Sequence, residues 1–524
     1  MKRFSTRASA LLPIFLFALL AITPPSALAG LEFQPVDDEI VKEFKKYFRK
    51  FKDSATRVEA IYSLEDADSP AMVKVLIPVL ADSDPEVVAA AIKILGTLQN
   101  REAIDAIFIR LAEEKKEPIR LGLLMTIGEA GYQGDNGALI ECLADKSWAI
   151  RYRTVQALEA RGERSAIPAI VELTKDKESA IRSASIEALT TMKHEPVVEI
   201  AILALNDKIW QVRSSAAKAL YVMRAKRSID PLISRMEQEE GRLLEDYSKA
   251  LEEITAKGYG LRTEMWRKWW IGIESRFEIP SDEALAKAKA KRAENRALYT
   301  PQGTSSYHGI ETPSRSVIYI IDVSGSMENQ VVEKERFKDG GYPSLRRIDI
   351  VKTELKRTIE TLEPYVKLNI LAFATDVKPW KKKLSTCNVL NKRSALDWVD
   401  RLEAIGGSSK EELAAVGLGG SANLEAGKTN TYGALMEALG VATRGSSGAR
   451  NKSYEVSVDT IFFLSDGRPT VGELVDPNDI LKEVRAANGL RKVLIHSIAI
   501  GEFQRKFMRD LAEENGGMFV DLGR

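Results

Sequence analysis

A short run of oxygen-bearing side chains follows an apolar stretch in the C-terminal half of this 524-residue chain. Asp322, Ser324 and Ser326 come directly after Ser316–Ile321, in the pattern D-x-S-x-S. A buried strand that ends in such a loop presents one carboxylate and two hydroxyls side by side. These are hard oxygen ligands, which small divalent cations such as Mg²⁺ prefer. The run therefore predicts a cation site at the end of a strand.

Two later segments supply further oxygen ligands. Thr429 opens a helical pattern, and Asp466 follows a second apolar strand, Val456–Leu464. From Ser316 onward, apolar runs alternate with amphipathic helices, which implies a mostly parallel sheet covered by helices on both faces. In such sheets ligands bind beyond the carboxyl ends of the strands. Asp322 and Asp466 both stand at ends of this kind, so we expect these side chains to meet there.

Together these segments resemble the von Willebrand factor A domain and its metal-ion-dependent adhesion site, over residues 316–524. The resemblance implies a doubly wound, Rossmann-like α/β fold. It also implies that Mg²⁺, or alternatively Mn²⁺ or Ca²⁺, is bound and that an Asp or Glu carboxylate of a protein partner completes its coordination. The implied metal-site residues are Asp322, Ser324, Ser326, Thr429 and Asp466.

Three features depart from the simplest form of that family's pattern. Lys428 stands before Thr429 where many relatives have a small residue. Two insertions, Glu328–Leu345 and Gly406–Ala426, flank the predicted site and would either shape or cover it. The alternative is a vestigial site, in which Asp322 only caps a turn.

The N-terminal half, residues 38–275, is periodic. An Arg recurs every 31 residues, each time after Ile or Val, with apolar residues four and seven positions later, at Arg120, Arg151, Arg182 and Arg213. Helix, turn and helix at a fixed interval predict an α-solenoid, and the repeats resemble HEAT-like repeats. We expect each Arg to bond the Asp or a carbonyl of the adjacent repeat, and a ligand-binding row is the alternative. Residues 276–315, an Ala/Lys/Glu-rich stretch followed by Ser, Thr, Pro and Gly, are predicted to be a linker.

Residues 1–29 have the features of a secretory signal peptide. Lys2, Arg3 and Arg7 precede the apolar segment Leu11–Ile22, and Ala27-Leu28-Ala29 is a small-residue cleavage site. We therefore expect export to a periplasm, cell envelope or extracellular space, with no transmembrane span after cleavage; an uncleaved anchor is the alternative. Only two cysteines are present, and a chain without a disulfide framework favours a bacterial periplasm or cell surface.

The composition and the absence of certain motifs disfavour nucleic-acid binding and two common kinds of enzyme. The chain has 76 basic and 75 acidic residues, and cleavage of the signal would remove three of the basic ones and leave 73. This near balance gives no electrostatic bias toward binding nucleic acid. Neither G-x-S-x-G nor a phosphate-binding G-x-x-x-x-G-K-[ST] occurs. We therefore predict a non-enzymatic, exported adaptor with a HEAT-like scaffold and cation-dependent adhesion to an acidic group. The alternatives are a metal-dependent hydrolase and an RNA-binding protein of Ro-like architecture.

Overall fold

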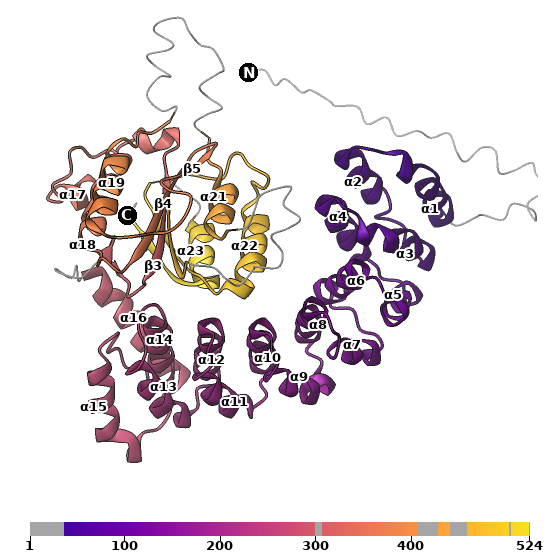
Figure 1. The fold of residues 1–524 in the computed structure, drawn as a ribbon, viewed down its shortest axis with the longest axis horizontal. Coiled ribbons are helices and arrows are strands. Elements are labelled where there is room, and N and C mark those ends of the chain that lie inside the picture. Colours follow the sequence, from indigo (N-terminus) through magenta and orange to yellow (C-terminus); the bar gives the residue numbers. More distant parts are fainter. Residues whose placement is uncertain (1–35, 299–305, 406–427, 441–457, 502–504, 523–524) are drawn as a thin grey trace, which may run out of the picture. The chain divides into compact units, whose positions relative to one another are not determined.

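The computed structural model describes residues 36–298, 306–405, 428–440, 458–501 and 505–522 (Figure 1). The chain divides into two compact units, residues 1–161 and 162–524, and the division falls within the helical repeats. The predicted signal peptide, residues 1–29, and the insertion Gly406–Ala426 lie outside the described residues.

The described part of the first unit is a row of paired helices. Alternate helices stack along the row, with α6 packed against both α4 and α8. The α-helices are α1 Val36–Tyr47, α2 Ser54–Tyr62, α3 Pro70–Leu76, α4 Pro85–Leu95, α5 Arg101–Glu113, α6 Glu117–Ala130, α7 Asn136–Cys142 and α8 Trp148–Ala160.

The second unit begins with further helices of the same kind. Helix α12 packs against both α10 and α14. The helices are α9 Ile167–Leu173, α10 Ser179–Thr191, α11 Val197–Ala204, α12 Trp210–Met223, α13 Ile229–Met236, α14 Leu243–Thr255, α15 Thr263–Ile273 and α16 Asp282–Leu298.

The repeated arginines hold successive turns together, as the sequence predicts. Arg182 Nε donates to Asp207 Oδ2 at 2.7 Å, and its Nη1 donates to the carbonyl of Asp176 at 2.8 Å. Arg120 forms the same pair with Asp145 in the first unit, and Arg213 pairs with Glu239 at 3.0 Å. The apolar residues seven positions after the arginines are buried, namely Ile127, Leu158, Leu189 and Leu220. The repeat is therefore a structural one, and the α-solenoid prediction is confirmed.

The remainder of the second unit is an α/β domain, which we call the A domain. Its main sheet has the order β5-β4-β3-β7-β8-β9, with β6 also paired to β4. β3, β4, β7, β8 and β9 are parallel, whereas β5 and β6 run antiparallel to β4. The strands are β3 Ser316–Asp322, β4 Lys367–Phe373, β5 Val377–Pro379, β6 Ser385–Thr386, β7 Thr460–Ser465, β8 Leu494–Ala499 and β9 Gly516–Asp521, and a separate two-stranded sheet pairs β1 Ser306–Tyr307 with β2 Ile310–Glu311.

Helices cover both faces of this sheet, which confirms the doubly wound fold (Figure 1). Helices α18 and α19 contribute the buried residues of one face, and α21, α22 and α23 those of the other. All seven residues of β3 are buried, as expected for a central strand with both faces covered. The helices are α17 Lys334–Phe337, α18 Arg347–Thr361, α19 Val389–Asp400, α21 Thr431–Ala438, α22 Pro477–Arg491 and α23 Arg505–Glu514.

The stretch that was predicted to be a linker contains packed structure. Helix α16 is ion-paired to α14, with Lys289 Nζ 2.7 Å from Glu253 Oε2. Tyr307 is buried in the A-domain core, with its ring centroid 5.1 Å from that of Tyr319. The core of the A domain therefore starts before Ser316, because an aromatic ring from β1 covers the side chains of β3. No helix in the described ranges combines the length and the apolarity that a bilayer crossing requires.

Candidate metal site

Asp322 is the last residue of β3 and is fully buried. Its Oδ1 accepts a hydrogen bond from the backbone N–H of Ser324 at 2.8 Å. Its Oδ2 accepts one from the hydroxyl of Ser465 at 2.5 Å. Because β3 and β7 are parallel neighbours, the chain after β7 returns to the same end of the sheet. The carboxylate is thus held from two adjacent strands.

Ser326 joins the first loop to the second carboxylate. Its hydroxyl donates to Asp466 Oδ1 at 2.6 Å and lies 3.2 Å from the hydroxyl of Ser324. Ser324 and Asp466 are both almost fully buried. Three of the predicted ligands are therefore linked through one hydroxyl, across 140 residues of sequence between Ser326 and Asp466.

Thr429 reaches the same cluster from the start of α21. Its backbone N–H donates to Thr470 Oγ1 at 2.8 Å, and its carbonyl accepts from the N–H of Thr470 at 3.0 Å. A Cβ atom built on Gly467 would lie 3.5 Å from Thr429 Oγ1 and 3.7 Å from Ser326 Oγ. Both hydroxyls therefore lie beside Gly467. The structure brings all five predicted side chains to the carboxyl ends of β3 and β7.

An arginine outside the predicted set of ligands belongs to this cluster. Arg347, the first residue of α18, is buried and donates from Nη1 to Asp466 Oδ2 at 2.6 Å. Gly501 has φ of +118°, and a Cβ atom there would lie 2.5 Å from the guanidinium carbon. Only glycine adopts such a backbone without strain, and only glycine leaves room for the arginine.

The pKa values of Asp322 and Asp466 are shifted because both carboxylates are buried in the same cluster. Burial and then the proximity of Asp466 raise the pKa of Asp322 to about 7, although the hydrogen bonds from Ser324 and Ser465 oppose this. Burial also raises the pKa of Asp466, against the hydrogen bonds from Ser326 and Arg347. Arg347, which pairs with Asp466, brings one positive charge to a cluster with two carboxylates, so the cluster carries an excess of negative charge when both are ionised.

The donor set fits a hard divalent cation. Two carboxylates and three hydroxyls offer oxygen alone, and Mg²⁺ is usually held by few charged groups together with water. Within the described ranges, no group of three or more His, Cys, Asp and Glu side chains is placed to hold a metal, so there is no rival site of the nitrogen or sulfur type. Both free cysteines are buried. The residues that would hold the cation are those of the hydroxyl–carboxylate cluster.

The insertion Glu328–Leu345 is folded onto the A domain. Val331 and Phe337 are buried, and the N–H of Val331 donates to the carbonyl of Leu345 at 3.0 Å. Arg346, just after the insertion, pairs with Glu328 at 3.0 Å. Since the segment begins two residues after Ser326, its packing holds the D-x-S-x-S loop in position.

Two functional contacts were missed from the sequence. Ser465, which donates to Asp322, stands directly before Asp466, and its place in Leu464-Ser465-Asp466-Gly467 was an available signal. Arg347 lies 119 residues from Asp466 and within no recognisable motif, so no local signal existed.

Comparisons with known families agree with this architecture. Residues 41–128 and 136–201 match HEAT repeats, and residues 212–238 match the PBS lyase HEAT-like repeat. Residues 342–417 and 420–521 match the von Willebrand factor type A domain. That match includes Thr429 and Asp466 but begins after the D-x-S-x-S loop, so Asp322, Ser324 and Ser326 rest on the geometry above.

Individual relatives resemble only part of the chain. Human inter-alpha-trypsin inhibitor heavy chain H4 is 27% identical over 211 residues, which are 40% of this chain and 18% of that protein. Human heavy chain H6 is 28% identical over 214 residues, 40% of this chain and 13% of the relative. The match thus spans less than a fifth of either relative.

One similar solved structure is that of an aerotolerance-related membrane protein from Bacteroides fragilis, with 15% sequence identity. The match covers 39% of this chain and 90% of that protein's chain, with a TM-score of only 0.25. The family matches and the heavy-chain relatives indicate a protein-interaction role for the A domain. The chain is a von Willebrand factor A domain protein with N-terminal HEAT-like repeats.

Proposed function

We propose that this protein is an exported, non-enzymatic adaptor that docks an acidic group of a protein partner through a divalent cation. The cation is held by Asp322, Ser324, Ser326, Thr429 and Asp466, and the HEAT-like repeats act as a scaffold. The observation that carries the proposal is one hydrogen-bonded cluster at the ends of β3 and β7: the hydroxyl of Ser326 contacts Asp466 and the hydroxyl of Ser324, and the N–H of Ser324 holds Asp322.

The charge balance of the cluster supports a bound cation. Burying an ionised carboxylate without a compensating charge is costly, and here Arg347 is paired with Asp466 of the two buried carboxylates. A divalent cation would neutralise the excess and could accept a further carboxylate from outside. We propose Mg²⁺ first, with Mn²⁺ or Ca²⁺ as alternatives, because all the ligands offered are oxygen atoms.

The chain's own residues prepare the site before a partner arrives. Ser465 and the N–H of Ser324 orient the two oxygens of Asp322. Ser326 orients Asp466 by donating to its Oδ1, and Arg347 contacts the other oxygen, Oδ2. An orientation held by several hydrogen bonds lowers the entropic cost of binding.

The groups around the carboxylates favour docking over hydrolysis. In the described structure, Asp322 and Asp466 accept hydrogen bonds from hydroxyls, a backbone N–H and a guanidinium. None of these donor groups is a general base near neutral pH. Burial lowers the pKa of His308 and of His496 to about 3, so neither exchanges a proton in that range.

The proposal is tested by titrating purified protein with Mn²⁺ and Mg²⁺ in a calorimeter. We expect Asp322→Ala to weaken cation binding by at least about tenfold, with an unchanged circular dichroism spectrum. Asp479→Ala, at an exposed carboxylate near the start of α22, is the matched control and should bind as wild type does. Equal affinity of wild type and Asp322→Ala would refute the metal site.

Docking and export have separate tests. Proteins captured from the native envelope fraction should be released by EDTA and be absent with Asp322→Ala. A partner retained in EDTA would refute cation-dependent docking even if the metal binds. For export, the N-terminal sequence of the protein isolated from its own cells should begin at Gly30, and an intact Met1 would contradict cleavage.

A further inference from the structure

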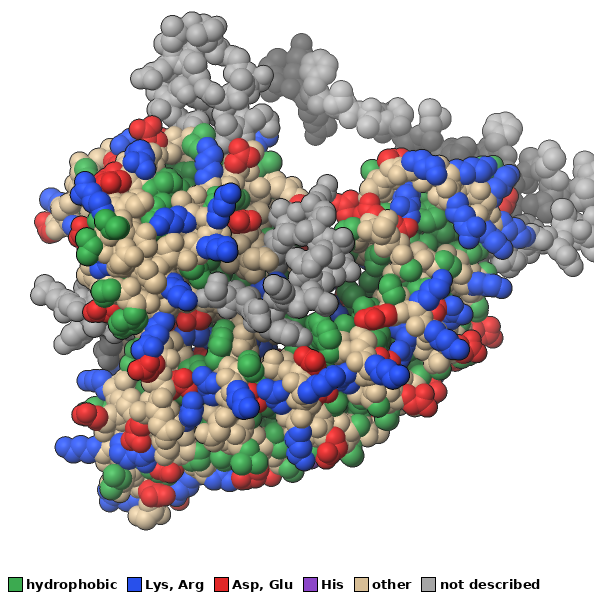
Figure 2. Space-filling model, viewed as in Figure 1, with side chains coloured by type: hydrophobic (Ala, Val, Ile, Leu, Met, Phe, Trp, Pro, Cys, Tyr) green, Lys and Arg blue, Asp and Glu red, His purple; other side chains and the backbone are tan. Residues whose placement is uncertain are grey.

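One segment of the A domain concentrates positive charge. Residues 377–394, which include β5, β6 and the first turns of α19, contain no Asp or Glu and six basic residues: Lys378, Lys381, Lys382, Lys383, Lys392 and Arg393. The whole chain has 76 basic and 75 acidic residues, so the remainder has 70 against 75. On the face shown in Figure 2, basic and acidic side chains are mostly interspersed. The segment is therefore an exception to the general charge balance.

Two aliphatic side chains project from the same segment. Val389 is 83% exposed and Leu390 is 81% exposed, more than any other large hydrophobic residue described. They begin α19 directly after its N-cap Asn388, whose side chain accepts a hydrogen bond from the N–H of Asn391 at 2.9 Å. A capped helix start holds this pair in a defined position.

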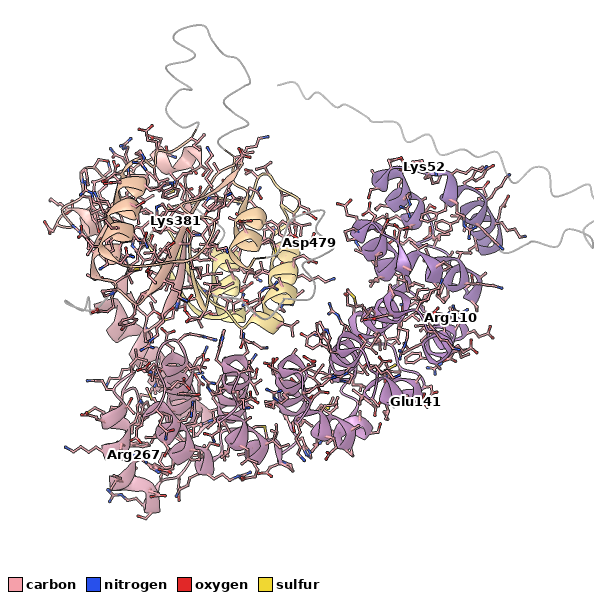
Figure 3. All side chains as sticks on the ribbon, in the orientation of Figure 1. Lys52, Arg110, Glu141, Arg267, Lys381 and Asp479 are labelled. Carbon is pink, nitrogen blue, oxygen red and sulfur yellow. The ribbon has the colours of Figure 1, made fainter. Side chains whose placement is uncertain are left out.

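The charges and the aliphatic pair form one surface, because the segment that contains β5 and β6 is hydrogen-bonded to α19. Lys381 Nζ donates to Asn391 Oδ1 at 2.6 Å, and the indole N–H of Trp380 donates to Ser394 Oγ at 3.3 Å (Lys381 is labelled in Figure 3). Asn391 also donates to the carbonyl of Thr386 at 2.8 Å. We call this region, residues 377–394, the basic–aliphatic surface.

Three of its six cations are available to a ligand. Lys378, Lys382 and Lys383 are exposed, and none of them forms an ion pair in the described part of the chain. The other three are engaged. Lys381 lies 4.4 Å from the centroid of the Trp380 ring and donates to Asn391, Lys392 Nζ donates to the carbonyl of Glu360 at 2.9 Å, and Arg393 pairs with Asp397 at 3.1 Å. Lysines on an edge strand also discourage pairing with another sheet, but that role does not require two exposed aliphatic residues beside them.

This surface extends to the end of the sheet opposite the metal site. Thr386 of β6 pairs with Lys367, the first residue of β4, whereas Asp322 pairs with Phe373, the last. Six residues of strand separate the two pairs, which is about 20 Å at roughly 3.3 Å per residue. A ligand at Val389 and Leu390 would therefore leave the hydroxyl–carboxylate cluster open.

We propose that the basic–aliphatic surface binds an anionic lipid bilayer. Clustered lysines are attracted to negatively charged headgroups, and their aliphatic stems lie along the interface while the ammonium groups reach the phosphates. Val389 and Leu390 enter the boundary of the acyl region, and the half-buried Trp380 lies at headgroup level.

The test is co-sedimentation of the full chain with lipid vesicles in EDTA, which removes any contribution of the metal site. Wild type should bind vesicles that contain phosphatidylglycerol and should bind pure phosphatidylcholine at least about tenfold more weakly, with an affinity for the anionic vesicles that falls as salt rises. The double variants Val389→Ser/Leu390→Ser and Lys382→Gln/Lys383→Gln should each lose roughly tenfold.

Two controls make the test decisive. Leu203→Ser, at an exposed leucine of α11, and Asp322→Ala should bind vesicles as wild type does. Equal binding to neutral and anionic vesicles, or undiminished binding by Val389→Ser/Leu390→Ser, overturns the proposal. So does binding to a soluble polyglutamate peptide as strong as that to vesicles, which would identify an acidic protein as the ligand.

Discussion

The contact between Arg347 and Asp466 gives the metal site its own internal cation. The guanidinium is buried and lies 2.6 Å from the carboxylate oxygen that Ser326 does not use. A cation held by Asp466 would share that carboxylate with the arginine. Like charges a few ångströms apart repel by a few kcal/mol at the effective dielectric constant of protein sites. Arg347 should therefore stabilise the metal-free protein and weaken the binding of metal.

The substitution Arg347→Met separates these two effects. It should lower the free energy of unfolding in EDTA by about 3 kcal/mol, because a buried carboxylate loses its partner. It should also tighten Mn²⁺ binding by about tenfold or more, since the competing charge is gone. Calorimetric titration measures the second effect, and urea unfolding in EDTA measures the first.

Arg347→Lys is the matched control, because it keeps the charge, and its affinity for Mn²⁺ should stay within a few-fold of wild type. Weaker Mn²⁺ binding by Arg347→Met would show that the arginine orients Asp466 and does not compete with the cation.

At the scale of elements, helix α14 contacts the chain that enters the A domain. Glu245 of α14 is held among Thr312, Arg242 and Asp246, and its Oε1 is buried without a hydrogen bond in the described structure. Burial raises the pKa of Glu245 to about 8, although the hydrogen bond to Thr312 and the charge of Arg242 oppose it. This carboxyl is therefore protonated in the folded state at neutral pH.

A pH dependence of stability follows from Glu245. Its pKa is higher in the folded than in the unfolded chain, so its contribution is complete below a pH of about 4.5 and is lost as the pH rises through about 8. Glu245→Gln should remove this dependence. Between pH 5 and pH 8.5, the free energy of unfolding of the variant should rise relative to that of wild type by about 4 kcal/mol.

Urea unfolding at those two pH values checks the difference, with Glu264→Gln, at an exposed position of α15, as the control. Parallel pH profiles of wild type and Glu245→Gln would show that Glu245 is ionised in the folded protein.

At the scale of the whole molecule, ion pairs join the A domain to the helices of its own unit. Lys492, the C-cap of α22, lies 2.6 Å from Glu187 of α10, and Arg315 lies 2.6 Å from Glu240. Burial acts to raise the pKa of Glu187, but Lys492 and Lys218 hold it below its ordinary value. Residues 162–524 should therefore unfold as one cooperative body.

Removing one partner of the Lys492–Glu187 pair tests that cooperativity. Lys492→Met should lower the free energy of unfolding by about 1–3 kcal/mol, because Glu187 keeps its burial but loses its nearest cation. Thermal unfolding should then separate into two transitions. The double variant Lys492→Met/Glu187→Met should be less destabilised than the sum of the single variants by at least about 1 kcal/mol.

The exposed pair Lys506–Asp510 supplies the control, and Lys506→Met should change stability by less than about 0.5 kcal/mol. Additive effects at Lys492 and Glu187 would show that their contact contributes nothing to stability.

Local patterns in the sequence were sufficient for the architecture and for the set of candidate ligands. The 31-residue interval of Arg120, Arg151, Arg182 and Arg213 predicted the helical repeats, because a repeated unit places the same residue in the same contact each time. Apolar runs that end in Asp322 and Asp466 predicted two parallel strands whose ends meet. Both are properties of short segments, which a sequence displays directly.

Only the tertiary structure decided which hydrogen bonds hold those ligands and which charged groups pair with them. Arg347 pairs with Asp466 across 119 residues, Ser465 reaches Asp322 across 143, and Lys492 reaches Glu187 across 305. Tyr307, in a stretch predicted to be a linker, fills the core beside Tyr319. Such contacts depend on how whole elements pack against each other. Hydrogen bonds and ion pairs form only when two groups lie within a few ångströms of each other. A local sequence pattern cannot predict which residues far apart in the chain will come that close.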